Sequence, residues 1–460
     1  MLRSAQLRRV PLAVLLGLLV HYLCFYTLHT PLWTETIAEW IMARTPSRYA
    51  VFFLTTLGPW AKPFAMTGGL AVLGFAASIA TLIHPLFGAI PTALALGWAF
   101  DYWSLLGQLS FWLPAILVLV PLAIPKLNRR REFLTMLTGF TAVALESYAR
   151  NRQLAQHANQ PVDLFPFQPP QENFGRGLVR KPVTPIPEFY GMSKNAVDPA
   201  LDPSEWRLRI SMDGHQTRQI SYAELLSLPR IERYVTLRCI SNTLQSDLMG
   251  TAAWSGFFLS QIIDRNQLIP GIVEIAVVGV DGHGDSFPID YAFSEEALFA
   301  LGMNGKTLDR THGFPIRLLT PRYYGFKNVK WIGEIAFVSK PYVGTWPKLG
   351  YTKQPLIHTA SHIDRVRKED DAIQVGGVSF AGVRGIRKVE LRADEGPWHD
   401  ATLEKPLSPY TWTRWVGTLP VAQAEVIEAR AQDDQSHWQE SIEGALFPDG
   451  VTGPTRRRVH

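Results

Sequence analysis

The chain has 460 residues and a formal net charge of +5, which leaves room for two or three domains. It contains no basic stripe interleaved with stacking aromatic residues, and this argues against nucleic acid as a partner. It has only two cysteines, of which Cys24 lies in an apolar stretch of membrane type, so no disulfide framework is expected.

Residues 1–150 have the pattern of a membrane region. Five apolar stretches are long enough, or nearly long enough, to span a bilayer as helices. They are residues 10–28, 63–83, 86–100, 107–124 and 134–145. Most tryptophans of this region fall near the ends of the stretches, as in the aromatic belts of membrane proteins. We therefore expect four or five transmembrane helices in a multi-pass cell-membrane protein that contacts lipid.

Two readings fit the arginine cluster before the last of these stretches. The run Arg130-Arg131-Glu132-Phe133-Leu134 resembles a twin-arginine export signal, and the alternative is a positive-inside cluster that flanks a fifth helix. Both place these arginines in the cytoplasm and everything after Ser147 on the extracytoplasmic side. The two histidines within the spans, His21 and His84, are isolated, so we predict no haem.

The rest of the chain predicts a soluble α+β part and a β-rich end. Residues 151–174 are polar and contain proline, which indicates a linker. We expect strands at 206–212, 234–241, 273–280, 316–319 and 329–338, with helices at 256–264 and 294–301. Residues 353–455 predict an immunoglobulin-like β-sandwich, because short alternating strands are separated by turn residues. Its strands are expected at 372–380, 385–393, 411–419 and 424–431.

Cys239 follows the strand-like run 234–238 and lies far from the predicted membrane region. A lone thiol in this position has three readings: a buried inert residue, a nucleophile, or a single protein ligand to a soft metal. The residue type alone leaves all three open.

Four motifs, in the same order as in the family, resemble the sulfite oxidase family of molybdopterin enzymes. They are 236–242 (TLRCISN), 303–317 (with His312 and Arg317), 325–331 (GFKNVKW), and Trp346 followed by Tyr351. Residues 377–415 resemble the family's C-terminal dimerisation domain. The resemblance covers about 185 to 440, and it implies a molybdopterin-binding catalytic domain at 175–352, with a homodimer as one expected state.

The resemblance also assigns roles to residues of this chain. Cys239 would be the protein ligand to the molybdenum of the cofactor, and Tyr351 would face the substrate as a second catalytic residue. The cofactor-binding set implied is Phe189, Tyr190, Cys239, Asn242, His312, Arg317, Asn328, Val329 and Lys330. A guanidinium and an imidazole suit the pterin phosphate. On residue type alone, His312 and Asn242 fit structural roles in turns equally well.

One departure leaves the substrate open. Met192 falls where the resemblance implies a sulfite-binding arginine, and the nearby Lys194 lacks the planar fork of a guanidinium. We expect a membrane-anchored oxidoreductase that transfers an oxygen atom between water and a small oxyanion or other sulfur-containing substrate. An external cytochrome or quinone would accept the electrons. The alternatives are an S- or N-oxide reductase of the same family and a non-catalytic membrane-tethered binding protein.

Overall fold

The computed structural model describes residues 161–195, 198–244 and 246–459, which belong to one compact unit, Ala158–His460. The expected transmembrane spans, the Arg130-Arg131 run, His21, His84 and the start of the linker lie outside the described residues. Within the ranges described, no helix is both long and apolar enough to cross a membrane.

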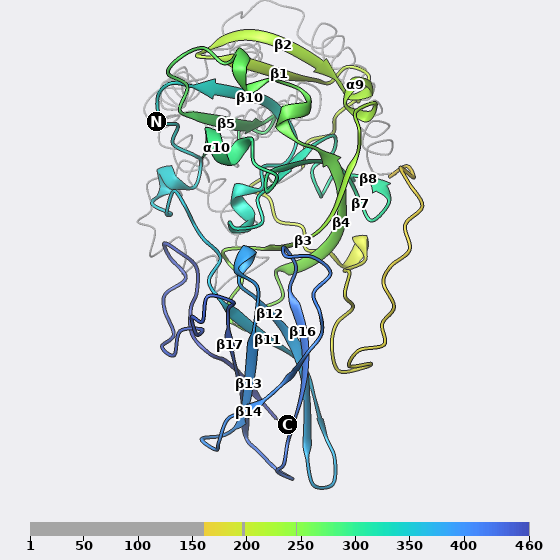
Figure 1. The fold of residues 1–460 in the computed structure, drawn as a ribbon, viewed down its shortest axis with the longest axis vertical. Helices are drawn as coiled ribbons and strands as arrows, with labels where there is room; N and C mark the ends of the chain where they lie inside the picture. Colours follow the sequence, from red (N-terminus) through yellow and green to blue (C-terminus); the bar gives the residue numbers. More distant parts are fainter. Residues whose placement is uncertain (1–160, 196–197, 245, 460) are drawn as a thin grey trace, which may run out of the picture. The chain divides into compact units, whose positions relative to one another are not determined.

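The first sheet has five strands in the order β2-β1-β10-β5-β6 (Figure 1). Its strands are β1 (Arg207–Met212), β2 (His215–Ser221), β5 (Glu274–Gly279), β6 (Gly284–Pro288) and β10 (Ile332–Val338). The pair β1 and β10 is parallel, and the other pairs are antiparallel. The expected strands at 206–212, 273–280 and 329–338 are therefore confirmed, with shorter bounds.

The second sheet has the order β3-β4-β7-β8, with β9 paired to β7. Its strands are β3 (Ile231–Arg238), β4 (Met249–Phe257), β7 (Leu298–Met303), β8 (Lys306–Thr307) and β9 (Arg317–Leu319). Every residue of β4 and β7 is buried. A large apolar cluster, which includes Leu208, Trp254 and Phe337, draws its side chains from both sheets.

The prediction of helices at 256–264 and 294–301 is wrong. Residues 256–257 end β4 and are followed by a single 3-10 turn, and residues 298–301 belong to β7. Both strands are buried along their whole length, so neither shows the two-residue alternation that identifies a strand in sequence. The described α-helices are short, α9 (Tyr222–Leu226) and α10 (Ile289–Ala292), so this part of the chain is mostly β rather than α+β.

The C-terminal part consists of two four-stranded antiparallel sheets, ordered β11-β12-β16-β15 and β14-β13-β17-β18. The first contains β11 (Ala360–Lys368), β12 (Ile373–Phe380), β15 (Thr402–Leu403) and β16 (Thr413–Leu419). The second contains β13 (Lys388–Ala393), β14 (His399–Asp400), β17 (Val426–Gln432) and β18 (Thr455–Arg458). Val375, Trp415 and Ile427 belong to the buried cluster that both sheets form. Two sheets around one core agree with the expected sandwich, and its immunoglobulin type stays a prediction.

A third buried cluster joins the two halves of this unit. It combines Ile240, Met249 and Tyr324 with side chains of the C-terminal part. Those side chains are Ile357, Val378, Phe380 and Trp412.

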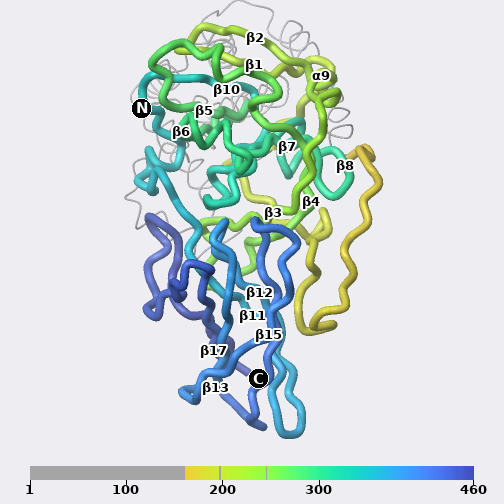
Figure 2. Tube along the Cα trace, viewed as in Figure 1, coloured from red at the N-terminus to blue at the C-terminus, as the bar shows by residue number. Residues whose placement is uncertain are grey.

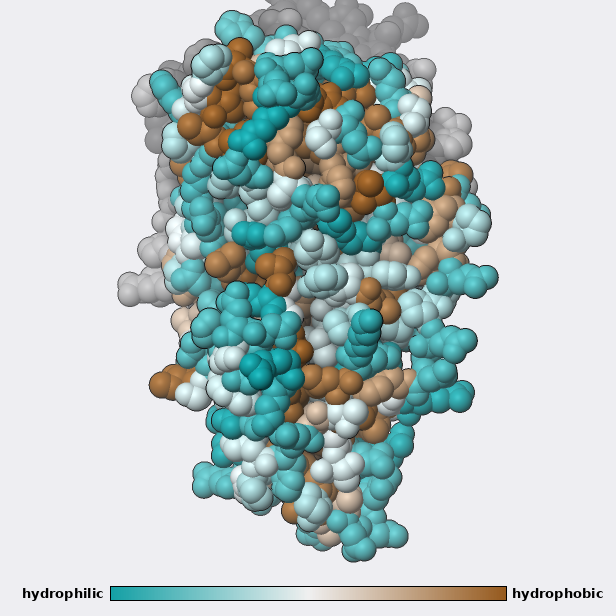
Figure 3. All heavy atoms as spheres, in the orientation of Figure 1, coloured by the Kyte–Doolittle hydropathy of each residue, from teal (hydrophilic) through white to brown (hydrophobic). Residues whose placement is uncertain are grey.

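The segment 161–190 runs along both halves (Figure 2). It bridges to β8 through Asp163 and Lys306. It then reaches β11, where Arg180 forms an ion pair with Asp364, and returns to β4 through the bond from Thr184 N to Thr251 O at 2.8 Å. The face seen in Figure 3 is mostly hydrophilic, with apolar side chains in separate small groups, as expected when the large apolar residues fill these cores.

Candidate active site

Cys239 lies directly after β3, and only 8% of its surface is exposed. It is a free thiol in the part of the chain that the structure describes. Its backbone N–H donates to Leu248 O at 2.9 Å, which holds the residue beside the start of β4. Burial raises the pKa of this thiol, and hydrogen bonds from Ser241 and the charge of Arg238 only partly oppose the shift.

Two tyrosines interact electrostatically with this thiol. Burial raises the pKa of Tyr190 well above its ordinary value; the negative charge of ionised Cys239 adds to the rise, and Arg317 opposes it. Burial, with the same contribution from Cys239, raises the pKa of Tyr351 to about 12. Both phenols are therefore protonated at neutral pH and can donate a hydrogen bond.

Arg317 begins β9 and is buried. Its guanidinium lies over Trp254 at 5.0 Å from the ring centroid, and one terminal nitrogen donates to His312 O at 3.0 Å. Its Nε is buried and has no hydrogen-bond partner among the described residues. Burial lowers the pKa of Arg317 to about 10, against the opposing charges of Tyr190 and Asp309. At neutral pH it remains a cation with an unused donor, as an anion site requires.

The ring of His312 is held in place by partners at both of its nitrogens. Its Nδ1 lies 2.8 Å from Asp309 Oδ1, and its Nε2 lies 3.3 Å from Phe189 O. The Phe189 ring meets His312 edge to face at 5.6 Å and stacks on Tyr190 at 5.4 Å. The structure therefore brings Phe189, Tyr190, His312 and Arg317 together. Their roles as cofactor ligands stay predictions.

The 3-10 turn η5 (Gly325–Lys327) packs close to the backbone of Cys239. A Cβ added to Gly325 would lie 2.9 Å from the Tyr190 hydroxyl and 3.5 Å from Cys239 Cα. A side chain here would crowd the site, so the close approach requires glycine.

The three expected cofactor residues that follow this turn make contacts within the protein. Asn328 is buried, and its Oδ1 accepts from Thr320 N at 2.7 Å. The backbone N–H of Val329 donates to Lys327 O at 3.1 Å. Lys330 Nζ donates to Thr311 O at 2.8 Å and lies 4.1 Å from the Trp331 ring centroid. Cofactor binding by Asn328, Val329 and Lys330 stays a prediction.

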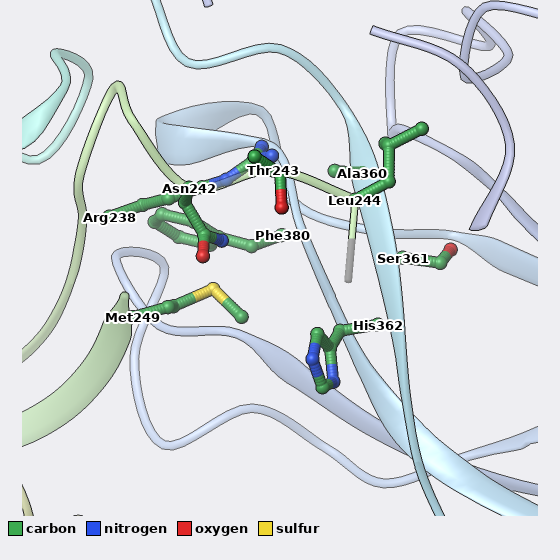
Figure 4. A pocket seen from close by; sticks show the side chains of 9 residues that line it. All are labelled: Arg238, Asn242, Thr243, Leu244, Met249, Ala360, Ser361, His362 and Phe380. Atoms are coloured by element: carbon green, nitrogen blue, oxygen red, sulfur yellow. The ribbon is translucent and has the colours of Figure 1, made fainter. Parts of the chain in front are cut away.

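Asn242 shapes the turn after Cys239, because its Oδ1 accepts from Leu248 N at 2.8 Å and from Ser246 Oγ at 2.9 Å. It also lines a hollow between this turn and the C-terminal sheets (Figure 4). Arg238, Met249, His362 and Phe380 face the same hollow. Cys239 is not among the lining residues, so this hollow is separate from the thiol.

The segment with the missing arginine is partly solvent-facing. Met192 is 47% exposed. Burial lowers the pKa of His283, and the positive charge of Lys194 adds to this shift. His283 Nε2 lies 2.9 Å from Phe326 O, next to the turn that covers Cys239. The structure thus offers a lysine and a half-buried histidine near this side of the site.

Sequence reasoning missed the ion pair that anchors η5. Lys327 is 1% exposed, and its Nζ donates to Asp285 Oδ1 at 2.7 Å. In the sequence it is one of two lysines in GFKNVKW, and no signal in that motif distinguishes the buried lysine from the other.

Comparisons with known proteins agree with this geometry. Residues 195–346 match the model of the oxidoreductase molybdopterin binding domain, a range that contains Cys239, His312 and Arg317. Human mitochondrial sulfite oxidase is 28% identical over 353 residues, covering 64% of this chain and 64% of that protein. The chain thus matches slightly under two thirds of the length of this relative. Sulfite oxidase of Arabidopsis thaliana is 24% identical over 379 residues, covering 67% of this chain and 94% of that protein.

Among solved structures, the sulfane dehydrogenase SoxCD from Paracoccus pantotrophus shares the fold. The TM-score is 0.50 at 18% identity, and the match covers 62% of this chain and 82% of that one. Residues 195–346, which include the buried free thiol after β3, therefore form an oxidoreductase molybdopterin binding domain, and the chain is similar to sulfite oxidases.

Proposed function

We propose that the protein is a membrane-anchored, extracytoplasmic molybdenum enzyme that transfers an oxygen atom to a sulfur-centred substrate. The observation that carries the proposal is the cluster of Cys239 with Tyr190, Tyr351 and Arg317 in a domain of the molybdopterin-binding type. In the oxidising direction the substrate gains one oxygen from water, and two protons and two electrons are released. The electrons leave to an external cytochrome or membrane quinone.

The residues present fit a molybdenum–pterin group. Within the described ranges, no set of three His, Cys, Asp or Glu side chains gathers to hold a metal. A metal at Cys239 would therefore take its other ligands from a bound organic group, as a pterin dithiolate provides. The buried Arg317 Nε, which lacks a partner among the described residues, suits the anionic end of such a group.

When bound, the molybdenum–pterin group supplies the two-electron redox chemistry. Cys239 would provide the thiolate ligand, and coordination to the metal would remove the thiol proton that burial otherwise retains. Arg317 would hold the negative charge of the pterin, with His312 and Lys330 beside it. Tyr351, whose phenol stays protonated, would donate a hydrogen bond to an oxygen of the substrate.

The proposal is tested by dye-linked assays on the purified full-length protein. Sulfite-dependent reduction of a dye acceptor supports oxidation, whereas sulfoxide-dependent oxidation of a reduced dye supports the S- or N-oxide reductase alternative. Met192 keeps that alternative open, because no guanidinium stands at its position. Cys239→Ser should abolish either activity and leave the fold intact, as checked by circular dichroism. Turnover near that of the wild type would refute the ligand role.

The same proposal includes two further partners, the lipid membrane and a second copy of this chain. Residues 1–150 would anchor the enzyme in lipid, and the C-terminal sheets would serve a homodimer. Light scattering of the detergent-solubilised protein, corrected for bound detergent, measures how many chains each particle contains. A mass of one chain per particle would exclude the dimer.

A further inference from the structure

A loop of the C-terminal sheets reaches back to the candidate active site. It comprises residues 444–453, between β17 and β18. The loop is closed at its base, where Gly444 N donates to Thr452 O at 3.1 Å and Gln439 Nε2 donates to Gly453 O at 2.6 Å. These bonds hold the loop in one shape, so its tip can act as a fixed support.

Phe447, near the tip, packs on Tyr351. Their ring centroids are 5.0 Å apart, with an angle of 79° between the rings. Trp346 and Phe326 meet the same tyrosine edge to face at 5.7 and 6.0 Å. Of these three aromatic neighbours, Phe447 is the closest, and it is the one that the C-terminal part supplies.

Two more contacts fix the tip beside Tyr351. The carboxylate of Asp449 accepts a hydrogen bond from the hydroxyl of Thr352, the residue after Tyr351. Gly450 has a φ of +98°, and a Cβ at this position would lie 2.8 Å from the ring of Tyr324. The loop therefore contacts the catalytic half of the unit through side chain and backbone alike.

The backbone around Tyr351 does not fix its side chain. Tyr351 follows the short 3-10 turn η6 (Pro347–Leu349) and Gly350, whose φ is +96°. A side chain on such a turn takes its orientation from the groups packed around it. Removal of the Phe447 ring would open one side of Tyr351 and let the phenol adopt other rotamers.

We propose that loop 444–453 positions Tyr351 toward Cys239, with Phe447 and Asp449 as positioning residues. This inference rests on the proposed function, because it takes Tyr351 as the group that faces the substrate. A misplacement of about 1 Å caused by a change outside the reacting groups can cost on the order of 100-fold in rate. The β-sandwich would thus complete the active site of its own chain.

The test compares variants of the full-length holoenzyme. Phe447→Ala should lower kcat about 10- to 100-fold with molybdenum content unchanged, and Phe447→Tyr, which keeps the ring, should stay within about twofold of the wild type. Trp438→Ala is the matched control, because Trp438 is a partly exposed aromatic residue of the same half that packs on Arg430 instead of Tyr351. It should leave kcat unchanged.

A double-mutant cycle separates positioning from a general structural effect. In a Tyr351→Phe background, Phe447→Ala should cause little further loss, because the hydroxyl that it positions is already absent. A loss equal to that in the wild-type background would overturn the inference. So would a wild-type kcat for Phe447→Ala.

A second measurement does not depend on turnover. In protein labelled with 3-fluorotyrosine, the fluorine resonance that disappears in Tyr351→Phe belongs to Tyr351. That resonance should shift or broaden in Phe447→Ala and stay unchanged in Trp438→Ala, and an unchanged resonance in Phe447→Ala would overturn the inference. A wild-type protein that binds molybdenum but acts on no sulfur substrate would instead refute the proposed function and leave the resonance test standing.

Discussion

The buried ion pair between Lys327 and Asp285 makes the sharpest stability prediction. Lys327 Nζ donates to Asp285 Oδ1 and Ser286 O, both at 2.7 Å, and lies 4.3 Å from the Phe287 ring centroid. Burial lowers the pKa of Lys327 and raises the pKa of Asp285, although each charge stabilises the other. Both charges have been removed from water, so each depends on its partner.

Lys327→Met should destabilise the protein by about 3–5 kcal/mol, because methionine fills the space and leaves the carboxylate of Asp285 buried without its cation. This is a large part of the roughly 5–15 kcal/mol that stabilises a folded protein. The double variant Lys327→Met/Asp285→Leu should recover most of the loss, since replacing both charges with apolar groups is often close to neutral.

The assay is urea unfolding of the purified full-length protein, followed by tryptophan fluorescence. Lys353→Met is the control, because Lys353 pairs with Glu274 at 2.7 Å but is 39% exposed, and such pairs contribute about 1 kcal/mol or less. A loss below about 1 kcal/mol for Lys327→Met, or a double variant less stable than the single one, would refute the reasoning.

Three further predictions concern the cofactor, acid stability and export. Arg317→Met should lower the molybdenum content per chain, because the buried cation that would hold the cofactor is lost. Mass spectrometry of the metal measures this content, and full loading would exclude a role of Arg317 in cofactor binding. Burial raises the pKa of Asp364, but hydrogen bonds from His362 and Arg180 outweigh the effect of burial. The pKa of Asp364 therefore lies below the ordinary 3.8. The stability that Asp364 contributes is therefore present above pH 3.8 and lost as the pH falls through the lower folded value. Asp364→Asn should flatten this acid limb in thermal melts, and an unchanged limb would contradict the assignment. The double variant Arg130→Lys/Arg131→Lys should leave the soluble part inside the cell in a protease-access assay, and normal surface exposure would leave only the positive-inside reading.

The sequence predicts those parts of the fold that have a local pattern. The strands around β1, β5, β9 and β10 follow from short apolar or alternating runs between turn residues, and Cys239 stands out because it follows a run of this kind. Tyr351, from the fourth motif, and Tyr190, from the expected cofactor-binding set, both interact electrostatically with this thiol, and their roles at a cofactor stay predictions.

Other features have no local signal. β4 contains small residues buried on both faces, so its sequence lacks the alternation of an edge strand. Lys327 resembles a surface lysine until the fold encloses it beside Asp285. Phe447 lies far along the chain from Tyr351, and only the tertiary structure brings the two rings together.

The third buried cluster, shared by Ile240, Tyr324, Phe380 and Trp412, affects how the unit unfolds. A cut after residue 352 would divide this cluster and expose apolar surface on both products. Residues 161–352 and 353–459 therefore should not behave as exchangeable modules. We expect them to melt in a single cooperative transition, so a substitution deep in the sandwich would lower the temperature at which the thiol site is lost.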